Sequence, residues 1–188
     1  MWPIFSGVVL LLLLEGCVTP AWQMAQSRYI PESKEIQLEL PSGWKQYNLL
    51  QREDPTVIQA LTRDGFALQA IFLKKVTLEM EFKNTKKRLS QSMLPQEVAE
   101  VFFDDVRSDP SKTNQQILEQ GPIKVDERSG FKILYTFQTK TGLKKQGLCY
   151  GVLNNSTFYS LIYEAPVRYY FDKDLRTFEN VKGSFRIL

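Results

Sequence analysis

The stretch FKILYTFQTKTGLKKQGLCYGVLNNSTFYSLIY, Phe131–Tyr163, decides the fold class of this 188-residue chain. Apolar residues alternate with polar or smaller ones in three successive segments, which is typical of β-strands with a buried face. The alternating residues are Phe131, Ile133, Tyr135 and Phe137, then Leu148, Tyr150 and Val152, then Tyr159, Leu161 and Tyr163. Turns at Thr141-Gly142 and Asn154-Asn155-Ser156 separate the segments. Sequential strands with short turns predict antiparallel neighbours.

Further strands are predicted upstream of this stretch. A strand bent near Gly121-Pro122 contains Ile117, Ile123 and Val125 and completes a four-stranded meander. Alternation also predicts a strand over residues 36–40, after which Pro41-Ser42-Gly43 turns the chain into Trp44. Residues 57–62 and a long alternating run over Phe66–Phe82 flank the hairpin signal Arg63-Asp64-Gly65. We expect that run to form one long antiparallel strand, or two strands joined at a bulge near Lys74, with one face on the core.

Two helices are predicted, one on each side of the meander in the sequence. Residues Pro95–Arg107 carry a proline at the first helical position and an apolar stripe formed by Val98, Val101, Phe102 and Val106. Near the C-terminus, Phe171, Leu175 and Phe178 recur at helical spacing, with Asp172 as the expected N-cap and Gly183 as the expected stop. Residues 184–188 suit a short closing strand. The order of elements predicts an α+β fold with a central antiparallel sheet flanked by helices.

The first 17 residues resemble a bacterial lipoprotein signal. Met1–Leu14 contains no charged side chain, and Glu15-Gly16-Cys17 follows a run of apolar residues. The resemblance implies that residues 1–16 are removed and that Cys17 is lipidated. An uncleaved signal anchor, a plain signal peptide and a buried apolar segment are the alternatives, and Glu15 interrupts a run already shorter than the about 20 residues of a spanning helix.

The predicted signal divides the chain into three parts. Residues 17–34 are expected to be a lipid-proximal tether, and residues 35–188 a single domain. The anchor makes the membrane the first partner and places the domain in the cell envelope. The residue after the cysteine is Val18, whereas the resemblance associates an aspartate at this position with retention in the inner membrane. In a bacterium with two membranes, we therefore expect the protein to be anchored in the outer membrane, facing the periplasm.

Composition excludes several kinds of chemistry. The chain has no histidine, which rules out Ser-His-Asp and Cys-His catalysis and histidine-ligated metal sites. With 24 basic and 21 acidic side chains the positive excess is too small to predict nucleic-acid binding. If Cys17 is lipidated, Cys149 has no disulfide partner. Its strand context predicts a buried apolar role, against the alternative of a reactive thiol.

Three groups of residues are candidates for binding. The aromatic group Tyr163, Tyr169, Tyr170 and Phe171 is either a ligand or partner surface or part of the core. The basic run Lys86–Arg88 is either a contact for phosphate-bearing lipids or a solvated loop. The acidic stripe Glu97, Glu100 and Asp104 is either a cation site or a solvated helix face.

Four segments carry a family resemblance, namely Leu40–Trp44, Thr62–Gln69, Met93–Glu100 and Phe178–Phe185. They resemble the corresponding segments of bacterial lipoproteins related to the PsbP, Mog1 and DcrB proteins, and the resemblance covers about Glu35–Leu188. The resemblance implies a PsbP/Mog1-like α/β/α sandwich and non-catalytic binding or assembly factors, with no cofactor, metal ligand or catalytic residue to carry over.

These observations favour one function and leave two others open. The favoured function is a lipid-anchored, non-catalytic envelope protein that binds a protein partner or supports assembly of an envelope complex. The alternative is a carrier of a small apolar or lipid ligand. The third is an enzyme that uses carboxylates or Cys149.

Overall fold

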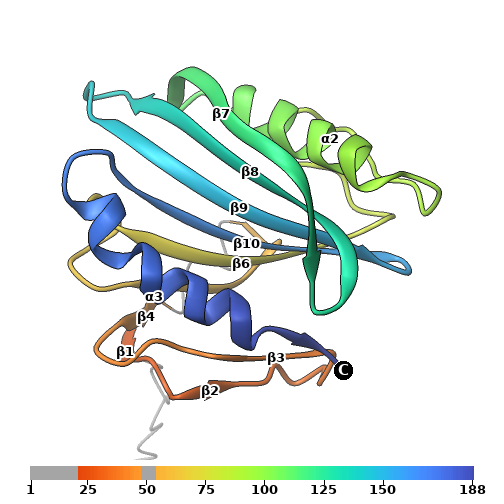
Figure 1. The fold of residues 1–188 in the computed structure, drawn as a ribbon, viewed down its shortest axis with the longest axis horizontal. Coiled ribbons are helices and arrows are strands. Elements are labelled where there is room, and N and C mark those ends of the chain that lie inside the picture. Colours follow the sequence, from red (N-terminus) through yellow and green to blue (C-terminus); the bar gives the residue numbers. More distant parts are fainter. Residues whose placement is uncertain (1–20, 48–53) are drawn as a thin grey trace, which may run out of the picture.

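A computed structural model describes residues 21–47 and 54–188, and within these ranges the chain forms two sheets and two helices (Figure 1). The main sheet has eight strands in the order β1-β4-β5-β6-β10-β9-β8-β7, and its neighbouring strands are antiparallel. A smaller sheet has the order β11-β3-β2. The predicted α+β class, with a central antiparallel sheet flanked by helices, is confirmed.

The bounds of the elements follow the chain. The strands before the first described helix are β1 (Trp22–Met24), β2 (Arg28–Tyr29), β3 (Ile36–Glu39), β4 (Lys45–Tyr47), β5 (Val57–Thr62) and β6 (Ala70–Thr77). Helix α2 (Pro95–Arg107) is followed by β7 (Lys112–Val125), β8 (Arg128–Thr139), β9 (Lys144–Asn154) and β10 (Thr157–Pro166). Helix α3 (Tyr170–Ser184) and β11 (Arg186–Ile187) complete the chain.

The predicted meander is present as β7, β8, β9 and β10, joined by tight turns. Positive φ angles at Glu127, Gly142 and Asn155 close the three turns. Strand β10 then pairs with β6, so the meander continues into the earlier half of the chain. This pairing places β10 near the centre of the sheet.

Both faces of the central strands are buried. Along β10, Phe158 and Ile162 belong to a hydrophobic cluster under α2, whereas Tyr159, Leu161 and Tyr163 belong to a second cluster under α3. Figure 1 shows the two helices packed against the sheet, α2 against the end that carries β7 and β8 and α3 near β3. The layers are therefore helix, sheet and helix.

Two glycines of β9 let aromatic rings of β8 lie across the sheet. A Cβ atom at Gly147 would overlap the Tyr135 ring, and one at Gly151 would overlap the Phe131 ring. Both rings are fully buried beneath α2. The glycines are thus required by close packing of rings on backbone.

Helix α2 begins and ends where the sequence predicts. Pro95 occupies its first turn, and the Leu94 N–H donates a 2.6 Å hydrogen bond to the Glu97 carboxylate. Val98 and Phe102 of the predicted stripe are buried, together with Ala99 and Phe103. Glu97 therefore has a local role in starting the helix.

The long strand predicted over Phe66–Phe82 is shorter in the structure, because β6 covers only Ala70–Thr77. Residues 66–68 form turns, and the buried Gln69 side chain donates to Asp64 and, over 2.9 Å, to Asp174 of α3. The expectation of a single core face was also wrong. Ile71 and Leu73 pack under α3, while Val76 packs under α2.

The described part of the predicted tether is folded, which corrects the expected domain start at Glu35. Strand β1 pairs with β4 at the edge of the main sheet, and β2 pairs with β3. The folded unit therefore begins by Trp22. The predicted signal segment and Cys17 lie outside the described residues. Within the described ranges, no helix is long and apolar enough to cross a membrane.

The terminal helix starts three residues earlier than expected. Its N-cap position is Tyr169, with φ 73°, instead of Asp172, and the Tyr170 N–H donates to the Arg168 carbonyl in a γ-turn. The helix continues through Gly183 to Ser184. The closing strand is confirmed as β11, which pairs with β3.

Candidate functional site

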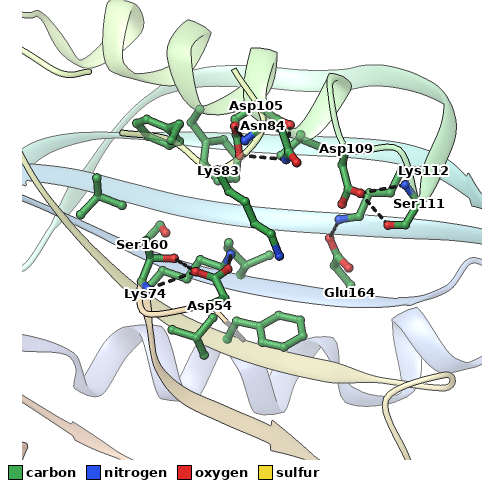
Figure 2. Close-up of a pocket in the computed structure, with 18 of the residues that line it drawn as sticks. Asp54, Lys74, Lys83, Asn84, Asp105, Asp109, Ser111, Lys112, Ser160 and Glu164 are labelled. Atoms are coloured by element: carbon green, nitrogen blue, oxygen red, sulfur yellow. Dashed lines mark hydrogen bonds and ion pairs between the residues drawn. The ribbon is translucent and has the colours of Figure 1, made fainter. Parts of the chain in front are cut away.

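A cavity of about 520 Å³ lies between α2 and the sheet, and Figure 2 shows the residues around it. Its floor is apolar and comes from β6, β10 and α2. The floor residues are Phe72, Val76, Phe102, Phe158 and Ile162. Four of them are buried, and Phe72 is half-buried. The cavity therefore borders the hydrophobic cluster between α2 and the sheet, and Phe72 is the one floor residue that is not buried.

An ion pair lies at one side of the cavity. Lys74 Nζ is 2.9 Å from Asp54 Oδ2, and the Thr56 N–H and hydroxyl also donate to the Asp54 carboxylate. Burial raises the pKa of Asp54, but the charge of Lys74 and these hydrogen bonds outweigh it and hold the pKa below its usual value. Asp54 is therefore a charged, internally bonded group.

A second ion pair joins Glu164 of β10 to Lys112 at the start of β7. The Tyr135 hydroxyl donates a 2.8 Å hydrogen bond to the same carboxylate oxygen. Burial raises the pKa of Glu164, yet Lys112 and Tyr135 more than offset it, so the net pKa is lowered. Burial, together with the nearby charge of Glu164, raises the pKa of Tyr135 well above its usual value. Glu164 is thus an ionised acceptor and Tyr135 a neutral donor.

The helix side of the cavity carries two further carboxylates. Asp105 accepts hydrogen bonds from the backbone N–H groups of Asn84 and Thr85 at 2.7 and 3.0 Å, and thereby fastens the preceding loop to α2. Asp109 accepts from the N–H and hydroxyl of Ser111 at 2.9 and 2.7 Å. Both carboxylates are engaged by hydrogen-bond donors of the protein itself.

Lys83 differs from the other charged groups around the cavity. Figure 2 shows its side chain running from beneath α2 into the cavity. Among residues 21–47 and 54–188, no hydrogen-bond or ion-pair partner contacts its amino group. The cavity therefore combines an apolar floor, carboxylates that already accept hydrogen bonds, and one cation available to a ligand.

The predicted aromatic group does not line this cavity and does not form one surface. Tyr163 is fully buried and donates hydrogen bonds to the Tyr170 and Phe171 carbonyls at 2.8 and 3.1 Å, and Phe171 packs in the α3 cluster. Tyr169, by contrast, is 65% exposed and contacts Tyr170 edge to face, with Lys173 Nζ 5.5 Å from its ring centroid. The structure therefore places Tyr163 and Phe171 in the core, Tyr170 half-buried against the α3 cluster, and Tyr169 on the surface.

The other sequence candidates are accounted for by local contacts. In the basic run, Lys87 pairs with Asp104 at 2.7 Å and Arg88 with Glu81 at 2.9 Å. In the acidic stripe, Glu97 caps α2, and Asp104 pairs with Lys87 and Arg107. In the described part of the chain, no three Cys, Asp or Glu side chains are grouped to hold a metal ion. Cys149 is buried, and burial raises the pKa of its thiol well above the usual value.

Sequence reasoning missed the cavity because its residues come from separate segments brought together only by folding. One signal was present. Ser160 and Glu164 share the parity of Phe158 and Ile162 in β10, so polar side chains were placed on an inward face of a buried strand. A buried carboxylate at such a position requires a partner, but the partner, Lys112, is 52 residues away in the sequence.

Replacing Lys112 with methionine should leave Glu164 buried without its cation and lower the free energy of unfolding by about 3 kcal/mol at pH 7. In the wild type, the pKa of Glu164 is lower in the folded state than in the unfolded state, where it is about 4.5. This difference stabilises the fold at pH values above about 4.5, and the stabilisation is lost as the pH falls through the pKa of the folded state. In the variant, the offset from Lys112 is lost, so the pKa of Glu164 in the folded state is higher than in the wild type. Urea denaturation of both proteins should therefore show a stability difference that is largest at neutral pH and shrinks as the pH falls towards and below about 4.5.

Two variants serve as controls for this measurement. Lys140→Met removes an exposed lysine in the β8–β9 turn and should leave stability unchanged. The double variant Lys112→Met/Glu164→Gln should regain most of the loss, since no charge is then buried without a partner. A stability difference that is the same at every pH would contradict the role assigned to this ion pair.

Comparison with known proteins agrees with this architecture. A family model described as PsbP matches residues 25–187. Cyanobacterial PsbP (CyanoP) from Synechocystis sp. PCC 6803 has a similar structure, with TM-score 0.62 and 16% identity over 92% of this chain and 96% of that one. The Ran-binding protein Mog1p from Saccharomyces cerevisiae gives TM-score 0.55 and 10% identity over 88% and 96% of the respective chains.

The predicted PsbP/Mog1-like fold is thereby confirmed. At these identities the structural likeness establishes the fold alone. No curated protein matches the chain in sequence. Since the family model covers most of the chain, the protein belongs to the PsbP family.

Proposed function

We propose that the protein is a non-catalytic binding protein that holds a small, mainly apolar ligand in the cavity between α2 and the sheet. The observation that carries this proposal is the cavity itself. Its volume of about 520 Å³ falls within the range of about 300–1,000 Å³ usual for small-molecule sites, and its floor is aromatic and aliphatic. Binding without chemistry is supported by the buried Cys149 thiol, with its raised pKa, and by carboxylates already bonded to protein donors.

Filling the cavity should displace the ligand. Val106 lines the cavity from the partly exposed side of α2, so Val106→Trp adds bulk there with little disturbance of the sheet. Solvent extracts of protein purified from membranes, analysed by mass spectrometry against a detergent blank, should contain a ligand for the wild type but not for Val106→Trp.

The matched control for this experiment is Val101→Trp. Val101 lies on the same helix with similar burial but does not line the cavity, so this variant should retain the ligand. Folding of both variants is checked by circular dichroism. A wild type free of ligand, or equal retention by all three proteins, would rule out this function.

We also infer that the protein works at the cell envelope, anchored through a lipid on Cys17. The signal-like segment ending at Leu14-Glu15-Gly16-Cys17 supports this. The first described strand starts only five residues after Cys17, a span of at most about 18 Å, so the domain would lie against the membrane. In a bacterium with two membranes, we propose the outer membrane, with the domain facing the periplasm.

The anchor is tested by replacing Cys17 with serine. Cells grown with a palmitate analogue should label the wild type but not Cys17→Ser, and the variant should leave the membrane fraction. Cys149→Ser is the matched control, because that thiol is buried and the anchor does not involve it. Continued labelling and membrane retention of Cys17→Ser would overturn this proposal.

A second candidate function is binding of an envelope protein at the β1 edge of the main sheet. Trp22 and Met24 are 45% and 61% exposed there, and Trp22 packs on Tyr47 with ring centroids 4.7 Å apart. A surface groove of about 570 Å³ runs beside them and includes Lys45. Since β1 ends the strand order of the described sheet, a partner with an apolar strand and acidic flanks would fit this edge.

This partner surface is tested by a photo-crosslinking amino acid at position 24 of the membrane-bound protein. A crosslink to one defined envelope protein is expected, and Trp22→Ser should weaken it. The same amino acid at position 188, where Leu188 is 66% exposed, provides the matched control and should give no such crosslink. Equal crosslinking from both positions would show that the β1 edge is not a specific surface.

A further inference from the structure

The charged groups around the α2 cavity select the kind of ligand that would complete it. Each of the carboxylates Asp54, Asp105, Asp109 and Glu164 already accepts at least two hydrogen bonds from the protein. A cationic head group would have to compete with these internal donors. The arrangement therefore disfavours a positively charged ligand.

The lysines around the cavity, in contrast, favour a negatively charged ligand. Lys74 and Lys112 are held by Asp54 and Glu164 at the two sides of the cavity. Lys83 lines the same cavity, and within the described ranges its amino group has no carboxylate or hydrogen-bond acceptor. In Figure 2 this amino group points into the space beneath α2. An ammonium group in this position favours an anionic group on the ligand, because charge-assisted hydrogen bonds are the strong ones.

The apolar floor of the cavity determines the chemistry of the rest of the ligand. Phe72, Val76, Phe102, Phe158 and Ile162 offer no polar side-chain atom, so the body of the ligand has to be apolar. A free inorganic anion would leave this surface uncovered. An apolar chain ending in a single negative charge satisfies both the floor and Lys83.

We propose that the α2 cavity binds a long-chain carboxylate, with its acyl chain on the aromatic floor and its carboxylate on the Lys83 amino group. This inference rests on the proposed ligand-binding function and specifies its substrate class. Lys83 precedes α2 in the loop that Asp105 fastens to the helix, so the head group would lie at the helix side of the cavity and the chain would extend over β6 and β10.

The test uses the full-length protein in isolated membranes and two photoactivatable probes of equal chain length, a diazirine fatty acid and the corresponding fatty alcohol. After irradiation, mass spectrometry of peptides identifies the labelled residues. The fatty acid should label peptides that contain Phe72, Val76 or Phe102, and an excess of inorganic phosphate or acetate should not reduce this labelling. The alcohol should label them about threefold less, because Lys83 is exposed and a charge pair in contact with water contributes less than about 1 kcal/mol.

Lys83→Met should reduce labelling by the fatty acid about threefold and leave labelling by the alcohol unchanged. Lys86→Met is the matched control, because Lys86 belongs to the same loop but does not line the cavity. Both probes should label the Lys86→Met variant as strongly as they label the wild type.

Equal labelling by acid and alcohol, with no effect of Lys83→Met, would overturn the carboxylate inference while preserving the apolar site. Labelling of no cavity peptide by either probe would reject the ligand-binding function itself. Competition by inorganic phosphate or acetate would assign the Lys83 site to free anions.

Discussion

Burial of strand β10 on both faces is the constraint on which the rest of the structure depends. Every residue of β10 after Thr157 is buried, and successive side chains enter different clusters. Phe158 packs on the side of α2, and Tyr159 packs on the side of α3. A strand of this kind is stable only when both sheet faces are covered, because apolar burial is the main favourable term in folding. The helix-sheet-helix layering follows directly.

The same constraint explains the chemistry of the cavity. Two polar residues of β10, Ser160 and Glu164, share the inward parity of Phe158 and Ile162 and so lie beneath α2 instead of in water. An ionised carboxylate there is tolerated only with partners, which Lys112 and Tyr135 provide. A cavity remains between helix α2 and this part of the sheet. The result is an apolar surface bordered by satisfied charges, in which Lys83 alone among the described lysines of the cavity lacks a partner.

Elements with a complete local signal could be predicted from the sequence. Helix α2 was predicted to the residue, since the periodicity and Pro95 both act within one segment. The strands of the meander were predicted because alternation and turns are local as well. The run from Phe66 misled because alternation alone favoured a strand, whereas Gln69 turns inward to bond Asp174, 105 residues away. Strands β1 and β2 were missed because they are two or three residues long and are held by distant partners such as Tyr47.

The aromatic residues at the start of α3 and the lysines around the cavity show where local sequence stops being sufficient. Tyr163 and Tyr169 look alike in the sequence, yet one is buried with its hydroxyl bonded to backbone carbonyls and the other is exposed at a residue with positive φ. The sequence by itself determined the fold class, helix α2 and the absence of histidine chemistry, because periodicity, turn residues and composition are properties of the chain. Only the tertiary structure decided which charges meet. The pairing of Lys112 with Glu164 and of Lys74 with Asp54, which leaves Lys83 as the unpaired lysine of the described cavity lining, depends on strands and loops that come together only when the sheet forms.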